Sequence, residues 1–100
     1  MQLNNTDFSV PFLKGADLRK LRLSNGFTTE KMATFAGVKT RKTYENWERD
    51  IGKPSFNQVI AMISAMKINP ISFVTALVKR NQHQENNVGL DELIETLDAA

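Results

Sequence analysis

The sequence contains no cysteine, and this absence excludes disulfide bonds and cysteine-ligated metal sites. It has a single histidine, His83, which lies among Gln and Asn residues, where an imidazole is most often simply solvated. It also lacks a glycine-rich phosphate loop and a recognisable carboxylate pair. These absences argue against an enzyme, and we expect no metal and no cofactor.

Long apolar runs are missing as well. None approaches the roughly 20 residues that span a membrane, and the N-terminus MQLNNTDFSV lacks the basic and apolar regions of a signal peptide. The lack of cysteine suits a reducing compartment, so we expect a cytoplasmic protein. A chain of 100 residues suits one domain with a modest hydrophobic core.

Charge is distributed unevenly along the chain. Residues 14–80 hold all 13 Lys and Arg residues against five acidic residues, whereas residues 81–100 hold five acidic residues and no Lys or Arg. The formal net charge of the whole chain is only +2. A basic body with an acidic tail favours a polyanion ligand and a tail that faces away from it. On charge alone, it is equally good to interpret the basic body and the acidic tail as ordinary solvated surfaces without a polyanion ligand.

Residues 28–50 have the pattern of two short helices joined by a turn at a glycine. Thr28 is suited to cap the first helix, and Gly37 ends it because glycine adopts the left-handed conformation at little cost. Thr40 can cap the second helix. The first helix places four apolar residues at helical spacing: Met32, Ala33, Phe35 and Ala36.

The second of these helices carries the candidate site. Its predicted inward stripe is Tyr44, Trp47 and Ile51, spaced three and four residues apart. Trp47 could alternatively stack on a base, but its spacing from Tyr44 favours a position in the core. A polar and mostly basic face points outward: Arg41, Lys42, Glu45, Asn46 and Arg49. A short helix that is anchored by aromatic residues and displays Arg, Lys and Asn fits the major groove of DNA.

The chain resembles the helix-turn-helix of the phage repressor and Cro-like (XRE-type) family. The resemblance covers residues 14–80 and rests on Arg22 four residues before Gly26, on GFTTEKMATFAGV, on WERDIGKPS and on the closing MKINPISFV. It implies an all-α, five-helix fold like that of the lambda repressor DNA-binding domain. It also implies a transcriptional regulator of phage, plasmid or bacterial origin. Such a regulator would act as a repressor, binding a palindromic operator as a homodimer through the helix at 40–50.

The resemblance further implies structural roles for particular residues. Ala33 would be the small residue where the two helices cross. Arg22 would pair with Glu48, which makes Glu48 a structural acid rather than a base reader. The chain departs from the family pattern by one additional residue between Val38 and Glu48, and by Asp50, where many members have glycine.

The predicted contacts to double-stranded DNA follow from the chemistry of the outward face and from the resemblance. Arg41 or Lys42 would make a bidentate contact to guanine, and Asn46 would bind adenine. Glu45 would either accept from cytosine or orient a neighbouring Arg or Lys. By resemblance, Thr29 would touch the DNA backbone. The other expected phosphate contacts are Lys39, Thr40, Arg49 and Lys53.

The flanking segments predict three further helices. The first spans Ala16 to about Asn25 with Leu18 and Leu21 inward. The second begins at Ser55, where Gln58 completes a capping box, and its expected stripe is Phe56, Val59, Ile60, Ile63 and Met66. The third opens at Asn69-Pro70, with Ile71, Val74, Leu77 and Val78 inward and with Lys79 and Arg80 complementing its C-terminus.

The two ends of the chain carry apolar patterns of their own. Phe8, Val10 and Phe12 alternate in residues 1–13, which indicates a short strand or an extended arm packed on the body. Residues 81–89 form a polar linker. The last segment is an acidic amphipathic helix, short enough to need a surface for its apolar stripe. That surface is its own body, a second copy or a partner protein, and the stripe gives the expected oligomerisation residues: Leu90, Leu93, Ile94 and Leu97.

Two other functions compete with a homodimeric repressor. An antitoxin-type module would bind DNA and also a partner protein through its tail or arm. A pure protein-interaction domain with the same fold would show no salt-dependent binding to DNA.

Overall fold

The computed structural model describes residues 13–83 and residue 94. Within this part of the chain there are helices and no strands, so the expected all-α, five-helix fold is confirmed. The helices are α1 (Gly15–Ser24), α2 (Thr29–Ala36), α3 (Arg41–Glu48), α4 (Phe56–Ala65) and α5 (Pro70–His83). Residues 1–12 of the predicted N-terminal arm lie outside the described residues, as do Leu90, Leu93 and Leu97.

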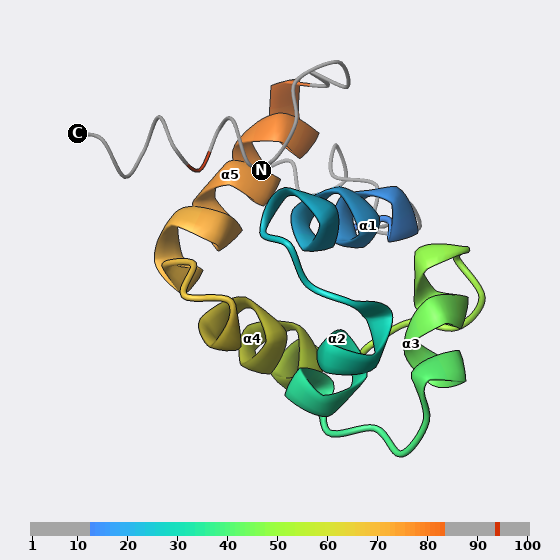
Figure 1. Ribbon diagram of the computed structural model, residues 1–100. Coiled ribbons are helices and arrows are strands. Elements are labelled where there is room, and N and C mark those ends of the chain that lie inside the picture. The colour runs from blue at the N-terminus through green and yellow to red at the C-terminus, as the bar shows by residue number, and fades with distance from the viewer. Residues whose placement is uncertain (1–12, 84–93, 95–100) are drawn as a thin grey trace.

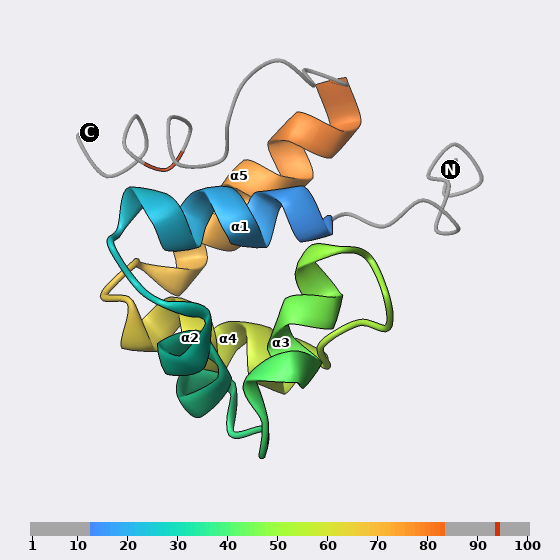
Figure 2. The same ribbon diagram turned by 45° about the vertical axis from the view of Figure 1, so that its right-hand side comes forward.

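The helices pack around one core. α2 packs against both α3 and α4, α1 packs against α3, and α4 packs against α5. In both views α1 runs above α2 and α3, with α5 beside it (Figures 1 and 2). No helix in residues 13–83 has the length and apolar character needed to cross a membrane.

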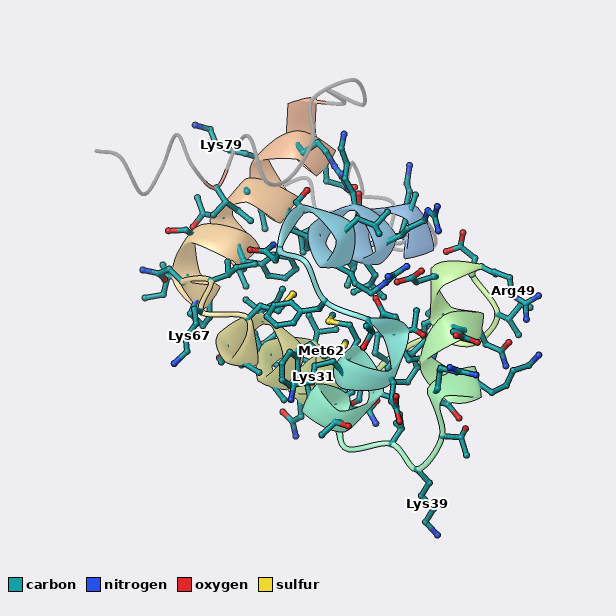
Figure 3. All side chains as sticks on the ribbon, viewed as in Figure 1. Lys31, Lys39, Arg49, Met62, Lys67 and Lys79 are labelled. Atoms are coloured by element: carbon teal, nitrogen blue, oxygen red, sulfur yellow. The ribbon has the colours of Figure 1, made fainter. Side chains whose placement is uncertain are left out.

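The core takes side chains from every helix. Met62 is fully buried and lies in the interior (Figure 3), where a flexible methionine fills gaps well. Ile94 is 6 % exposed and belongs to the same cluster, so this member of the predicted C-terminal stripe packs on the body of its own chain. The other buried apolar residues are Leu18, Leu21, Met32, Ala33, Ala36, Tyr44, Trp47, Ile63, Met66, Phe73, Ala76 and Leu77.

Local hydrogen bonds set where the helices begin. The Thr28 hydroxyl accepts from the Lys31 amide at 3.0 Å, and the Thr40 hydroxyl accepts from the Thr43 amide at 3.3 Å. Ser55 and Gln58 form the expected reciprocal capping box. The Asn69 side chain accepts from the first free amides of α5. Gly37, with φ of 77°, ends α2 in the left-handed conformation.

Several predicted core residues are exposed instead. Ile51 follows the end of α3 and is 52 % exposed, so the inward stripe stops at Trp47. Phe56 is the first residue of α4 and is also exposed, whereas the buried residues of that helix are Met62 and Ile63. In α5, Ile71 and Val74 were predicted to face the core but are exposed. Phe73 and Ala76 are buried instead.

The C-terminal end of α5 also differs from the prediction. The helix continues to His83, so residues 81–83 are not linker. Arg80 is buried and pairs with α1. Its two terminal nitrogens donate to the two carboxylate oxygens of Asp17 at 2.7 and 2.9 Å. This bidentate pair joins α5 to the first turn of α1.

Candidate nucleic-acid interface

The orientation of α3 is fixed by its two aromatic residues. Tyr44 is fully buried and Trp47 is 7 % exposed, and their rings meet edge to face with centroids 6.0 Å apart. The spacing of three residues puts both on one face of the helix. The opposite face of α3 is therefore held toward solvent.

An ion pair holds the C-terminal end of α3 against α1. Arg22 Nε donates to Glu48 at 2.7 Å and a terminal nitrogen donates to its other oxygen at 3.2 Å. The two side chains are only 11 % and 8 % exposed. The hydrogen bond to Glu48 raises the pKa of Arg22, so the guanidinium stays charged. The structure thus contains the Arg22–Glu48 pair that the resemblance implies.

The residues next to this pair bring α1 and α3 into backbone contact. A Cβ atom at Gly15 would lie 2.5 Å from the Glu48 carbonyl oxygen and would collide with the Trp47 carbonyl as well. Asp50 has φ of 62°, a left-handed conformation that Asp adopts more readily than most residues. Its side chain accepts from the Gly15 amide at 2.8 Å. The carboxylate at Asp50, where the family often has glycine, therefore caps the first turn of α1.

The predicted DNA contacts lie along the free face of α3 and at its two ends. Arg41, Lys42 and Arg49 are exposed, and Glu45 and Asn46 are half-buried. Lys39 and Thr40 are exposed in the turn before α3, and Lys53 is exposed in the loop after it. Figure 3 shows Lys39 and Arg49 pointing outward at opposite ends of α3.

Hydrogen bonds organise this face before any ligand binds. Glu45 Oε2 accepts from the Thr29 hydroxyl at 2.7 Å and lies 3.5 Å from Arg41 Nε. Glu45 therefore links the start of α2 to α3 and faces the Arg41 guanidinium. Asn46 Oδ1 accepts from Arg49 at 2.6 Å, so these two predicted contact residues are paired with each other.

A polar pocket of about 410 Å³ opens where α1, α2 and α3 meet. The predicted residues Thr29, Lys42 and Arg49 contribute to its lining, together with the Arg22–Glu48 pair. Arg19 of α1 lines it too, although this residue was not among those predicted from the sequence. Its signal was present, because a residue three positions before Arg22 lies on the same face of a helix.

The Tyr44 hydroxyl is the exception in an otherwise satisfied site. Its oxygen is buried and has no hydrogen-bond partner among the described residues. Burial, and after it the neighbouring Glu48, raise the pKa of Tyr44 above its usual value. The phenol therefore stays protonated and neutral, as suits a residue of the core.

Comparison with known proteins places this architecture in a family. A family model described as "Helix-turn-helix" matches residues 18–73, more than half of the chain, including α2, the turn at Gly37 and α3. Neither the curated proteins nor the solved structures include a significant match to this sequence. The chain belongs to the helix-turn-helix family of the XRE type, whose members are DNA-binding transcription regulators.

Proposed function

We propose that this protein represses transcription by binding a palindromic operator as a homodimer, with α3 in the major groove of each half-site. The observation that carries the proposal is the exposed basic face of α3, whose other face is fixed by Tyr44 and Trp47. The sign of regulation and the homodimer rest on the resemblance to phage repressors.

Attraction to the DNA backbone comes from the cations at the ends of α3. Lys39, Arg49 and Lys53 are exposed and lie on or beside α3, where they can neutralise phosphates and release counterions. Thr40 is exposed next to Lys39 and contributes a hydroxyl. Thr29 begins α2, and its hydroxyl donates to Glu45, so the groups that can bind a phosphate there are the unpaired backbone amides of the helix terminus.

Base reading is assigned to the front of α3. Arg41 is the preferred guanine reader, because Glu45 lies 3.5 Å from its Nε and is itself held by Thr29. This geometry supports the orienting role for Glu45 over acceptance from cytosine. Lys42 is the alternative guanine contact, placed one residue further along α3.

Asn46 requires a rearrangement to read adenine. A bidentate contact to adenine uses both the amide nitrogen and the carbonyl oxygen, and Arg49 occupies that oxygen in the free protein. When Arg49 turns to a phosphate, the Asn46 oxygen is released. Backbone binding by Arg49 and base reading by Asn46 are therefore coupled in this proposal.

A dimer follows from how little one domain can read. A single recognition helix contacts only a few base pairs, and a dimer doubles the site and makes it palindromic. The C-terminal segment is the proposed contact between copies through Leu90, Leu93 and Leu97. The burial of Ile94 would anchor that segment to the body.

Selection of bound duplexes from a random DNA pool tests the proposal directly. We expect a palindromic motif with half-site centres about 10 base pairs apart, or a multiple of that spacing. Enrichment of no motif, or affinity that does not change with salt, would overturn the proposal.

Two substitutions then separate base reading from backbone contact. Arg41→Ala should cost roughly 1–3 kcal/mol at one base position of the selected site, and it should leave binding to random DNA nearly unchanged. Lys39→Ala, the matched control, should weaken binding to all sequences alike. Equal losses on selected and random DNA for Arg41→Ala would remove it as the guanine reader.

A further inference from the structure

We propose that Arg19 of α1 and Lys42 of α3 together hold a phosphate of the DNA backbone at the pocket between α1, α2 and α3. The recognition surface would then extend onto α1, outside the two helices of the helix-turn-helix unit. This inference rests on the proposed function. It adds Arg19 to the contact residues and assigns Lys42 to a phosphate instead of the alternative guanine contact.

Arg19 comes from α1 and Lys42 from α3, and both line the same pocket. Arg19 and Arg22 are three residues apart and share the face of α1 that meets α3. Lys42 and Glu45 share a face of α3 in the same way. All four line the pocket of about 410 Å³, which lies beside the free face of α3.

The charges in this pocket are not balanced. Arg22 is paired with Glu48. The Glu45 carboxylate accepts from the Thr29 hydroxyl and faces Arg41. Within residues 13–83, the side chains of Arg19 and Lys42 make no ion pair and no hydrogen bond. Two exposed cations that face one polar pocket without a carboxylate of their own favour an anion between them.

The partner is a backbone phosphate because the pocket cannot move independently of α3. The Arg22–Glu48 pair and the bond from the Gly15 amide to Asp50 fix α1 against the end of α3. A helix that enters the major groove has a phosphate chain on each side of it. Docking of α3 would therefore carry Arg19 toward the chain that runs past α1.

A pair of glutamine substitutions on α1 tests the inference. Lys20 is exposed, adjacent to Arg19 and equal in charge, but it does not line the pocket, so Lys20→Gln is the matched control. Each variant is titrated with the selected duplex and with a random duplex of equal length, over a range of salt concentrations. Fluorescence anisotropy gives the dissociation constants.

Arg19→Gln should reduce the magnitude of the slope of log K against log salt by about 0.9 on both duplexes, the value expected for one phosphate contact. Lys20→Gln should keep the wild-type slope. Because both residues are exposed, circular dichroism should show the same thermal unfolding for the two variants.

The possible failures are distinguishable. Equal slopes for Arg19→Gln and Lys20→Gln, with salt-dependent binding by the wild-type protein, would overturn the contact at Arg19 and leave the proposed function standing. Wild-type affinity that does not respond to salt would overturn the proposed function itself. A loss on the selected duplex alone would also overturn the inference, because it would make Arg19 a reader of sequence.

Discussion

Asp50 combines a backbone conformation that destabilises the fold with a side-chain hydrogen bond that stabilises it. Its φ of 62° is a conformation that costs an L-residue roughly 1–2 kcal/mol, with aspartate at the low end. Its side chain also accepts from the Gly15 amide at 2.8 Å, a capping interaction worth about 0.5–2 kcal/mol. A substitution can remove either contribution or both, and the free energy of unfolding should report which.

The three informative replacements differ in what they keep. Asp50→Ala loses the capping bond and increases the backbone strain, so it should destabilise the fold by about 1–3 kcal/mol. Asp50→Gly loses the same bond but relieves the strain, and should stay within about 1 kcal/mol of the wild-type protein. Asp50→Asn keeps an oxygen acceptor and tolerates the left-handed conformation, so it should also stay within about 1 kcal/mol.

Urea denaturation provides the measurement, followed through the fluorescence of Trp47, the single tryptophan. The slope against urea should not change, since the folded and unfolded surfaces remain alike. If Asp50→Gly is as unstable as Asp50→Ala, the positive φ contributes nothing. If Asp50→Ala is as stable as the wild-type protein, neither the strain nor the cap has the assigned energy.

Three further predictions concern the core and the ion pair. Arg22→Ala should cost about 3–5 kcal/mol, because it leaves Glu48 buried and unpaired, and a double-mutant cycle with Glu48→Gln that shows no coupling would contradict this. The folded-state pKa of Tyr44 is raised, so the unfolded chain loses the phenol proton first as pH rises. The stability that is present below the ordinary pKa of 10.0 is therefore lost as pH rises above it. Tyr44→Phe should therefore flatten the fall in unfolding free energy above pH 10.0, by up to about 1.4 kcal/mol per pH unit, and an unchanged slope in urea titrations would contradict it. Ile94→Ala should cost about 2–5 kcal/mol by urea denaturation, against under 0.5 kcal/mol for the exposed control Ile51→Ala, and equal losses would remove Ile94 from the core.

The sequence by itself determined where α2 to α5 begin and which face of α3 points outward. Thr28, Thr40, Ser55 and Asn69 bond to amides only two or three residues away, so their capping could be predicted without a fold. The direction of α3 was also decided locally, since Tyr44 and Trp47 are the large apolar side chains within that helix. Arg22 with Glu48 was found through family resemblance, because no local rule joins residues 26 positions apart.

Only the tertiary structure decided which face of α5 is buried. Ile71, Val74 and Leu77 are spaced three residues apart, but Phe73 is likewise three and four residues from Ala76 and Leu77. Periodicity alone cannot choose between the two sets. Packing against α4 selected the set that contains Phe73.

The long-range polar contacts were likewise beyond the sequence. Arg80 and Asp17 are 63 positions apart, and Asp50 and Gly15 are 35 apart. Each of these groups has many other polar partners of equal chemistry along the chain. Their pairing is decided only when the apolar faces pack and bring α5 and the end of α3 against the first turn of α1, because burial penalises any polar group left without a partner.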